Sequence, residues 1–366
     1  MLLQLLALLC GSLAAADFYV SPDGDDSAAG TQAAPFRTPA RAAAAVRGAN
    51  AAMTADLHVY LRGGAYYLPS ALSLGLADGG SGGYFVRWSA FPGETPVLHK
   101  GAAVTGWAAH DAAKNIWAAP LPAGVTDARQ AYVNGARMNS TNTGSGLPAG
   151  WAVTSSGYTT TVPLAAWTAP PEQNAADLEF LYTGDGSSWT ECRLRVATIT
   201  GGGMTVTMQE PGFTLGRNRY YGQAIKTPQS VANVYALLGA GTPGQGYINS
   251  ATRIIYYVPR AGEDMATAQV LVPSGDEALL TVQGDPAGAA PQRVSGLAFE
   301  GLTFSYAGWL DPNSGLGYVT MQSGETSLIS LHCAAAAAVV QCARAYTFLR
   351  TAHPPLLHRR LSRAAQ

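Results

Sequence analysis

Short apolar runs with a period of two mark the first hundred residues. Leu57, Val59 and Leu61 alternate with more polar neighbours and stop at Gly63, and this alternation is typical of a half-buried β-strand. Similar runs cover residues 66–68, 72–76 and 84–88. Because loops rich in Gly and Asp separate these runs, the spacing predicts a solenoid in which each coil adds roughly two or three strands to stacked parallel sheets.

One segment near the start has a helical composition. Thr38 can cap a helix with Pro39 at its first position, and residues 40–53 are almost uninterrupted Ala, with Arg41, Val46 and Arg47 among them. The first coil of a solenoid would expose its apolar cross-section and an unpaired strand edge to water. We therefore expect this helix to cap that end.

The pattern changes between residues 110 and 275. Residues 130–137 contain two β-prone runs around Asn134 and Gly135, which is a strong signal for a β-hairpin. Further strand-like runs cover residues 178–182, 192–199, 204–208 and 254–259. We expect an antiparallel β-sandwich or barrel at 110–275, inserted between the first coils at 17–109 and a resumed coil at 276–325.

The composition supports an all-β fold class, with strands as the main secondary structure. Of 366 residues, 48% are hydrophobic and only 12% are charged, and 42 Gly with 22 Pro imply many turns. The net charge is −1. Since no stretch combines clustered Lys and Arg with interleaved aromatics, neither nucleic acid nor an anionic membrane surface is an expected partner.

Residues 1–16 have the features of a secretory signal peptide. An apolar run from Leu2 to Leu9 is followed by small residues up to Ala16, although the usual basic start is missing, and a buried first strand or helix is the alternative. The run is too short to span a bilayer. We expect a secreted chain that begins at Asp17, without a membrane span, and with an N-glycosylation sequon at Asn139.

The end of the chain differs from the rest. Residues 326–366 contain five Arg and no acidic residue, and we expect an atypical basic tail, mistranslated or disordered, with a genuine basic tail as the alternative. After signal removal three cysteines remain, namely Cys192, Cys333 and Cys342. A disulfide between Cys333 and Cys342 and a pair of reduced, buried thiols are both open.

Three ordered blocks of residues resemble a known family. Residues 19–26, with 30–31, 35–38 and 41–47, resemble the opening signature of secreted pectate-lyase-like β-helix proteins, and 61–68 and 90–98 resemble its next two blocks. Residues 132–135, 189–193, 257–265 and 317–324 are similar to segments of β-helix glycosidase-like proteins that carry an inserted domain. The resemblance implies a right-handed parallel β-helix.

The same resemblance implies activity on carbohydrate. We expect a secreted glycoside hydrolase-like protein that acts on a plant or microbial polysaccharide or oligosaccharide, as a monomer and without a cofactor; a polysaccharide lyase is less favoured. In the resembling proteins the acid pair lies in later coils that have no counterpart here, so the chain is expected to stop before its catalytic coils. Two alternatives stay open, a non-catalytic carbohydrate-binding or cell-wall-associated β-helix protein and a fragment without function.

Few residues are candidates for chemistry. Asp311 is the carboxylate to watch because it lies in a loop beside a predicted sheet, although an Asp before Pro312 also starts turns. The acidic run at 23–26 could hold Ca²⁺, but a solvated turn explains it better. His58, His99 and His110 have no second ligand at metal spacing, so no metal site is expected.

Aromatic residues are numerous for a chain with so few charges. Exposed rings can stack on sugar faces, whereas buried rings fill cores. We assign a carbohydrate-binding role to Tyr306, Trp309 and Tyr318. Most of the other tryptophans between residues 100 and 200 are expected to pack in cores, and they are Trp107, Trp117, Trp151, Trp167 and Trp189.

Overall fold

The computed structural model describes most of the chain. The described residues are 17–144, 150–168, 170–183, 190–218, 225, 228–239, 241–273, 278–285, 292–313, 318–321, 329–332, 339–341 and 344–345. The predicted signal peptide at 1–16 lies outside them. The chain divides into two compact units, the first formed by residues 1–99, 278–305 and 327–366 and the second by 100–277 and 306–326.

Among its described residues, the first unit contains three sheets in which every strand pairing is parallel. The largest has the order β1 (Phe18–Val20), β2 (Leu57–Leu61), β5 (Val86–Ala90), β23 (Leu297–Glu300) and β27 (Val339–Gln341). The second has the order β26 (Ile329–His332), β22 (Leu280–Gln283) and β4 (Leu72–Leu74). The third has the order β28 (Arg344–Ala345), β24 (Thr303–Ser305), β6 (Pro96–His99) and β3 (Gly64–Tyr67).

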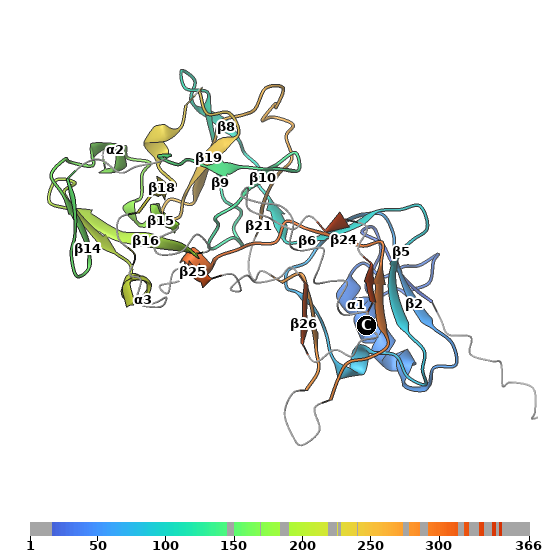
Figure 1. Cartoon of the computed structure of the whole chain (residues 1–366). Helices are drawn as coiled ribbons and strands as arrows, with labels where there is room; N and C mark the ends of the chain where they lie inside the picture. Colours follow the sequence, from blue (N-terminus) through green and yellow to red (C-terminus); the bar gives the residue numbers. More distant parts are fainter. Residues whose placement is uncertain are drawn as a thin grey trace, which may run out of the picture. The chain divides into compact units, whose positions relative to one another are not determined.

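Register in the largest sheet aligns apolar residues into rungs. Val59 pairs with Trp88, and Trp88 pairs with Phe299, so three buried side chains stack across β2, β5 and β23; β2 and β5 lie side by side in Figure 1. The period-two pattern of the sequence produces this stack, because alternate residues of a strand point to the same face.

Helix α1 (Pro39–Ala49) begins as the sequence predicts. The Thr38 hydroxyl accepts a hydrogen bond from the Arg41 N–H at 3.1 Å, and the helix packs against β1, β4 and the 3₁₀ helix η2 (Leu76–Asp78). The helix is shorter than predicted and continues as a 3₁₀ turn, η1 (Asn50–Ala52). The Asn50 amide donates to the Ala77 and Gly79 carbonyls at 2.8 and 2.7 Å. These hydrogen bonds hold the chain where the α-helix ends and the 3₁₀ turn begins.

Strands also occur in the terminal segment expected to be atypical or disordered. Strands β26, β27 and β28 each extend one of the three parallel sheets. Short apolar runs, such as Val339 and Val340, suit a rung position. Cys333 and Cys342 lie outside the described residues.

The second unit is built mainly from antiparallel pairs. Its largest sheet has the order β13 (Trp151–Val153), β14 (Gly157–Thr160), β17 (Thr205–Met208), β16 (Thr190–Thr200), β15 (Glu179–Thr183) and β18 (Ser230–Ala232), with β25 (Tyr318–Met321) also pairing β16. A second has the order β12 (Asn139–Ser140), β19 (Gln245–Asn249), β20 (Ile254–Tyr257), β9 (Ile116–Pro120) and β8 (Ala108–Asp111), with β12 parallel to β19. A third has the order β11 (Ala136–Arg137), β10 (Tyr132–Val133), β21 (Val270–Pro273) and β7 (Gly101–Ala103).

Short helices complete the second unit. They are α2 (Ala165–Thr168), α3 (Gly212–Asn218), η3 (Ala175–Asp177), η4 (Tyr235–Leu237) and η5 (Asp311–Asn313). The predicted hairpin is confirmed, because β10 pairs antiparallel with β11 across Asn134 and Gly135, whose φ angles are +49° and +82°. The expectation of a mostly β chain with few helices is confirmed as well.

Candidate functional site

The loop of residues 306–313 belongs to the second unit and carries two of the predicted carbohydrate-binding residues. Tyr306 is half-buried with φ +53°, and its ring centroid lies 4.8 Å from that of buried Tyr132. Trp309 is half-buried, with the Arg129 guanidinium 4.6 Å and the Arg193 guanidinium 5.8 Å from the ring centroid. Two guanidiniums therefore lie near the Trp309 ring, at distances from its centroid that are typical of cation–π contacts.

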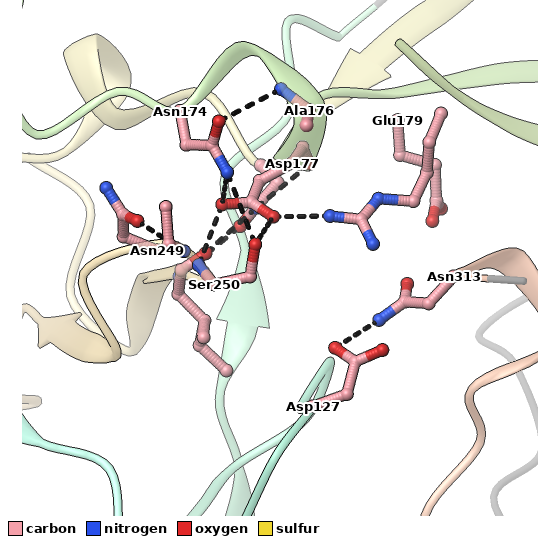
Figure 2. Close-up of polar contacts among 12 residues, drawn as sticks. Asp127, Asn174, Ala176, Asp177, Glu179, Asn249, Ser250 and Asn313 are labelled. Atoms are coloured by element: carbon pink, nitrogen blue, oxygen red, sulfur yellow. Dashed lines mark hydrogen bonds and ion pairs between the residues drawn. The ribbon is translucent and has the colours of Figure 1, made fainter. Parts of the chain in front are cut away.

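The third predicted residue lies close along the backbone. Tyr318 begins β25 and pairs with Arg193 of β16, but its side chain lies outside the described part. The same limit holds for the side chain of Asp311, which begins η5. Asn313 ends that turn and donates from its amide to the Asp127 carboxylate at 2.7 Å (Figure 2).

Strand β16 supplies the charges around this loop through simple alternation. Cys192, Leu194 and Val196 point into the hydrophobic core of the largest sheet. The intervening residues, Glu191, Arg193 and Arg195, therefore share the opposite face. Because strands bury one face and the sequence alternates without interruption, one face of β16 is apolar and the other is charged.

Glu179 of β15 is the centre of a buried ion cluster on this face. It binds Arg129 and also Arg193, the latter at 2.8 Å, and Arg193 binds Glu191 as well. Burial on its own raises the pKa of Glu179, but the nearby Arg129 and Arg193 charges outweigh it, so the pKa is lowered. Glu179 is thus held as a carboxylate and is unsuited to donate a proton.

Asp177 forms a second, adjacent network (Figure 2). Its buried carboxylate binds Arg195 and accepts from the Ser250 hydroxyl at 2.6 Å, the Ser250 N–H at 2.8 Å and the Asn174 amide at 2.9 Å. These bonds join η3 to the turn after β19. We assign Asp177 a structural role because its oxygens are occupied by protein donors.

The acidic run considered as a Ca²⁺ site belongs to the first unit. In the acidic run, Asp25 accepts from Ser27, and Asp26 accepts from the backbone N–H groups of Arg37 and Thr38, so these carboxylates hold the opening turn together. Within the described residues no three His, Cys, Asp or Glu side chains form a group that could bind a metal ion.

The isolated histidines have different surroundings. His58 stacks on Tyr60 with ring centroids 5.3 Å apart, His99 is buried, and His110 contacts Glu172 at 3.1 Å. This last pair was missed in the sequence because its members are 62 positions apart.

The glycosylation sequon has an exposed asparagine and a buried threonine. Asn139 lies in β12, whereas the Thr141 hydroxyl accepts from the Val234 N–H at 2.8 Å. The hydroxyl of the sequon is thus engaged within the folded unit, while the asparagine is accessible.

The other tryptophans of the second unit pack in cores or against them where the structure describes them. Trp151 and Trp167 belong to the core of the largest sheet, and Trp107 and Trp117 pack against the core between the other two sheets. Trp189 lies outside the described residues. Across the described chain, no helix is long and apolar enough to cross a membrane.

Comparisons with known proteins show similarity in fold and, locally, in sequence. No family model matches the chain. Over 92 residues, or 25% of its length, the chain is 38% identical to the pectate lyase PEL9 of Emericella nidulans, of which it covers 20%. A solved structure described as a glycoside hydrolase aligns with a TM-score of 0.66 and 21% identity, over 81% of this chain and 52% of that one. The chain shares the fold of that structure and spans about half of its length.

Proposed function

We propose that this chain is a secreted, carbohydrate-active protein of the right-handed parallel β-helix class that binds a polysaccharide. The rotation of the chain through three parallel sheets supports the architecture, since β2, β3, β4, β5 and β6 visit the three sheets in turn. The structural likeness to a glycoside hydrolase and the local similarity to a pectate lyase support the substrate class.

The single observation that carries the proposal is the fixed aromatic loop. The Arg129 and Arg193 guanidiniums lie 4.6 and 5.8 Å from the centroid of the half-buried Trp309 ring, and Tyr306 of the same loop packs against Tyr132. A ring that already packs against protein groups has less conformational freedom to lose when a sugar stacks on it. Arginines beside the ring can also donate hydrogen bonds to sugar hydroxyls.

Binding is favoured over hydrolysis at this loop. A glycosidase needs two carboxyl groups, and the acid among them needs a raised pKa. The pKa of Glu179 is lowered, and Asp177 is engaged by Arg195, Ser250 and Asn174. Hydrolysis is the second candidate, supported by the likeness to a glycoside hydrolase.

The test is a binding and hydrolysis panel of neutral and acidic plant and microbial polysaccharides. Replacing Trp309 by Ala should weaken binding by about tenfold, the equivalent of one lost aromatic stacking contact. Tyr84→Ala is the matched control because Tyr84 is an exposed aromatic residue of the first unit. Equal affinity of wild type and W309A would contradict the proposed site.

Hydrolysis is read from the same samples as release of reducing ends. If sugar is released, Asp311→Asn is the first variant to examine, because a catalytic carboxylate loses most of its activity when its charge is removed. Unchanged release by D311N would remove Asp311 as a candidate. Secretion is tested separately by N-terminal sequencing of protein from the culture medium, which should begin at Asp17.

A further inference from the structure

A hollow of about 600 Å³ lies in the second unit, and its lining includes neither Trp309 nor the arginines that contact it. Its size falls within the range of small-molecule sites, roughly 300–1,000 Å³. Three segments line it, which are the turn between β8 and β9, the turn before η3, and η4. The lining side chains include His110, Asp111, Lys114, Pro171, Glu172 and Tyr235.

The walls of the hollow are tied to each other. The His110 Nε2 lies 3.1 Å from the Glu172 carboxylate, so the β8 end contacts the 170–173 turn directly. Asp111 accepts from the Lys114 N–H at 3.1 Å, which fixes the turn after β8. The Glu172 carbonyl accepts from the Asn249 amide at 2.7 Å. The polar groups are thus positioned before any ligand arrives.

The floor is aromatic and equally fixed. Tyr235 is buried, and its ring packs edge-on against Tyr256 and Tyr247, with centroids 5.1 and 5.6 Å apart. The Tyr235 N–H donates to the Gln173 side chain at 2.8 Å. A floor of this kind can present apolar surface without rearranging.

We propose that this hollow is a second binding site, for a neutral saccharide; the inference rests on the proposed carbohydrate function. Asp111 and Glu172 can accept hydrogen bonds from sugar hydroxyls, and Lys114 can donate them. The exposed Pro171 ring offers apolar surface to sugar C–H groups, whereas the buried Tyr235 ring supports the hollow from below. The two carboxylates face the hollow with one ammonium group, so an acidic sugar is disfavoured by charge.

The experiment titrates the full chain with neutral β-1,4-linked tetrasaccharides of glucose, xylose and mannose, with tetragalacturonate as the acidic probe, by calorimetry and saturation-transfer NMR. The W309A variant should keep a binding event for at least one neutral probe. Adding Glu172→Gln to W309A should weaken that event by about tenfold, because a charged hydrogen-bond acceptor becomes a weaker neutral one. His110→Ala should weaken it too.

Glu300→Gln is the control, since Glu300 is a partly exposed carboxylate of the first unit. The inference is overturned if W309A abolishes all binding, if E172Q and H110A leave the residual affinity unchanged, or if tetragalacturonate competes there as well as the neutral probes. Each of these results leaves the Trp309 site standing. The proposed primary site fails instead if the affinity of every probe in the panel is unchanged by W309A, while loss of binding in E172Q would still support the hollow.

Discussion

Replacing Glu179 by Gln should destabilise the second unit more than any surface charge substitution. The change keeps the shape of the side chain but removes the negative charge that faces Arg129 and Arg193. The Arg129 and Arg193 guanidiniums would then lie in an environment that contains little water. Among the ion pairs described by the structure, Arg193 would keep its pair with Glu191. An unpaired buried charge is costly because the protein cannot solvate it as water does.

The magnitude follows from burial. The side chains of Glu179, Arg129 and Arg193 are 6%, 13% and 21% exposed, so solvent screens the cluster weakly. Removing one partner of such a buried pair costs about 3–5 kcal/mol of unfolding free energy. Glu300→Gln is the matched control, because Glu300 is 42% exposed and such a pair contributes about 1 kcal/mol or less.

The assay is urea unfolding followed by tryptophan fluorescence, at several pH values. Because the pKa of Glu179 is lowered on folding, its contribution is fully present above the ordinary Glu pKa of about 4.3 and is lost as the pH falls through the folded-state pKa. The difference between wild type and E179Q should therefore shrink on acidification. A loss equal to that of E300Q at neutral pH, or a difference that grows in acid, would refute the buried-cluster argument.

Two further substitutions test packing and the loop. Gly246→Ala should cost about 1–3 kcal/mol, because a Cβ there would lie 2.6 Å from the backbone carbonyl oxygen of Tyr256 and 2.1 Å from the Met138 sulfur, and the backbone atom cannot move aside as a side chain can. Gly124→Ala meets nothing within 4 Å and should be neutral in the same thermal melts; equal melting temperatures would show that the site relaxes freely. Asp127→Ala removes the acceptor for Asn313, and amide hydrogen exchange across 306–313 should speed up by about tenfold; unchanged exchange would mean that the other contacts suffice to hold the loop.

The sequence predicts local structure correctly where that structure is determined by residues only a few positions apart. The Asn134-Gly135 hairpin and the Thr38 cap are of this kind, since a two-residue turn and a capping bond need no distant partner. The end of α1 was not readable. Asn50 leaves the helix because its amide binds carbonyls some thirty residues later, and propensity cannot anticipate such tertiary competition.

The sequence predicts only part of the buried ion cluster around Glu179, for the same reason. The alternation of Glu191, Arg193 and Arg195 with apolar residues is present in the chain and indicates a strand with one polar face. Nothing in that pattern shows that the polar face is buried. The partners that bury it, Glu179 and Arg129, come from other segments and meet β16 only in the folded unit.

The surroundings of Trp309 differ from those that the sequence predicts. The sequence suggested an exposed ring in a chain poor in charge, but the ring lies against two of the few buried cations. Its orientation therefore depends on Glu179, which holds both guanidiniums in place. It follows that E179Q should weaken sugar binding indirectly, together with stability, whereas W309A should weaken binding with little loss of stability. Comparing the two variants under conditions where both are folded separates the residue that contacts the sugar from the residue that positions it.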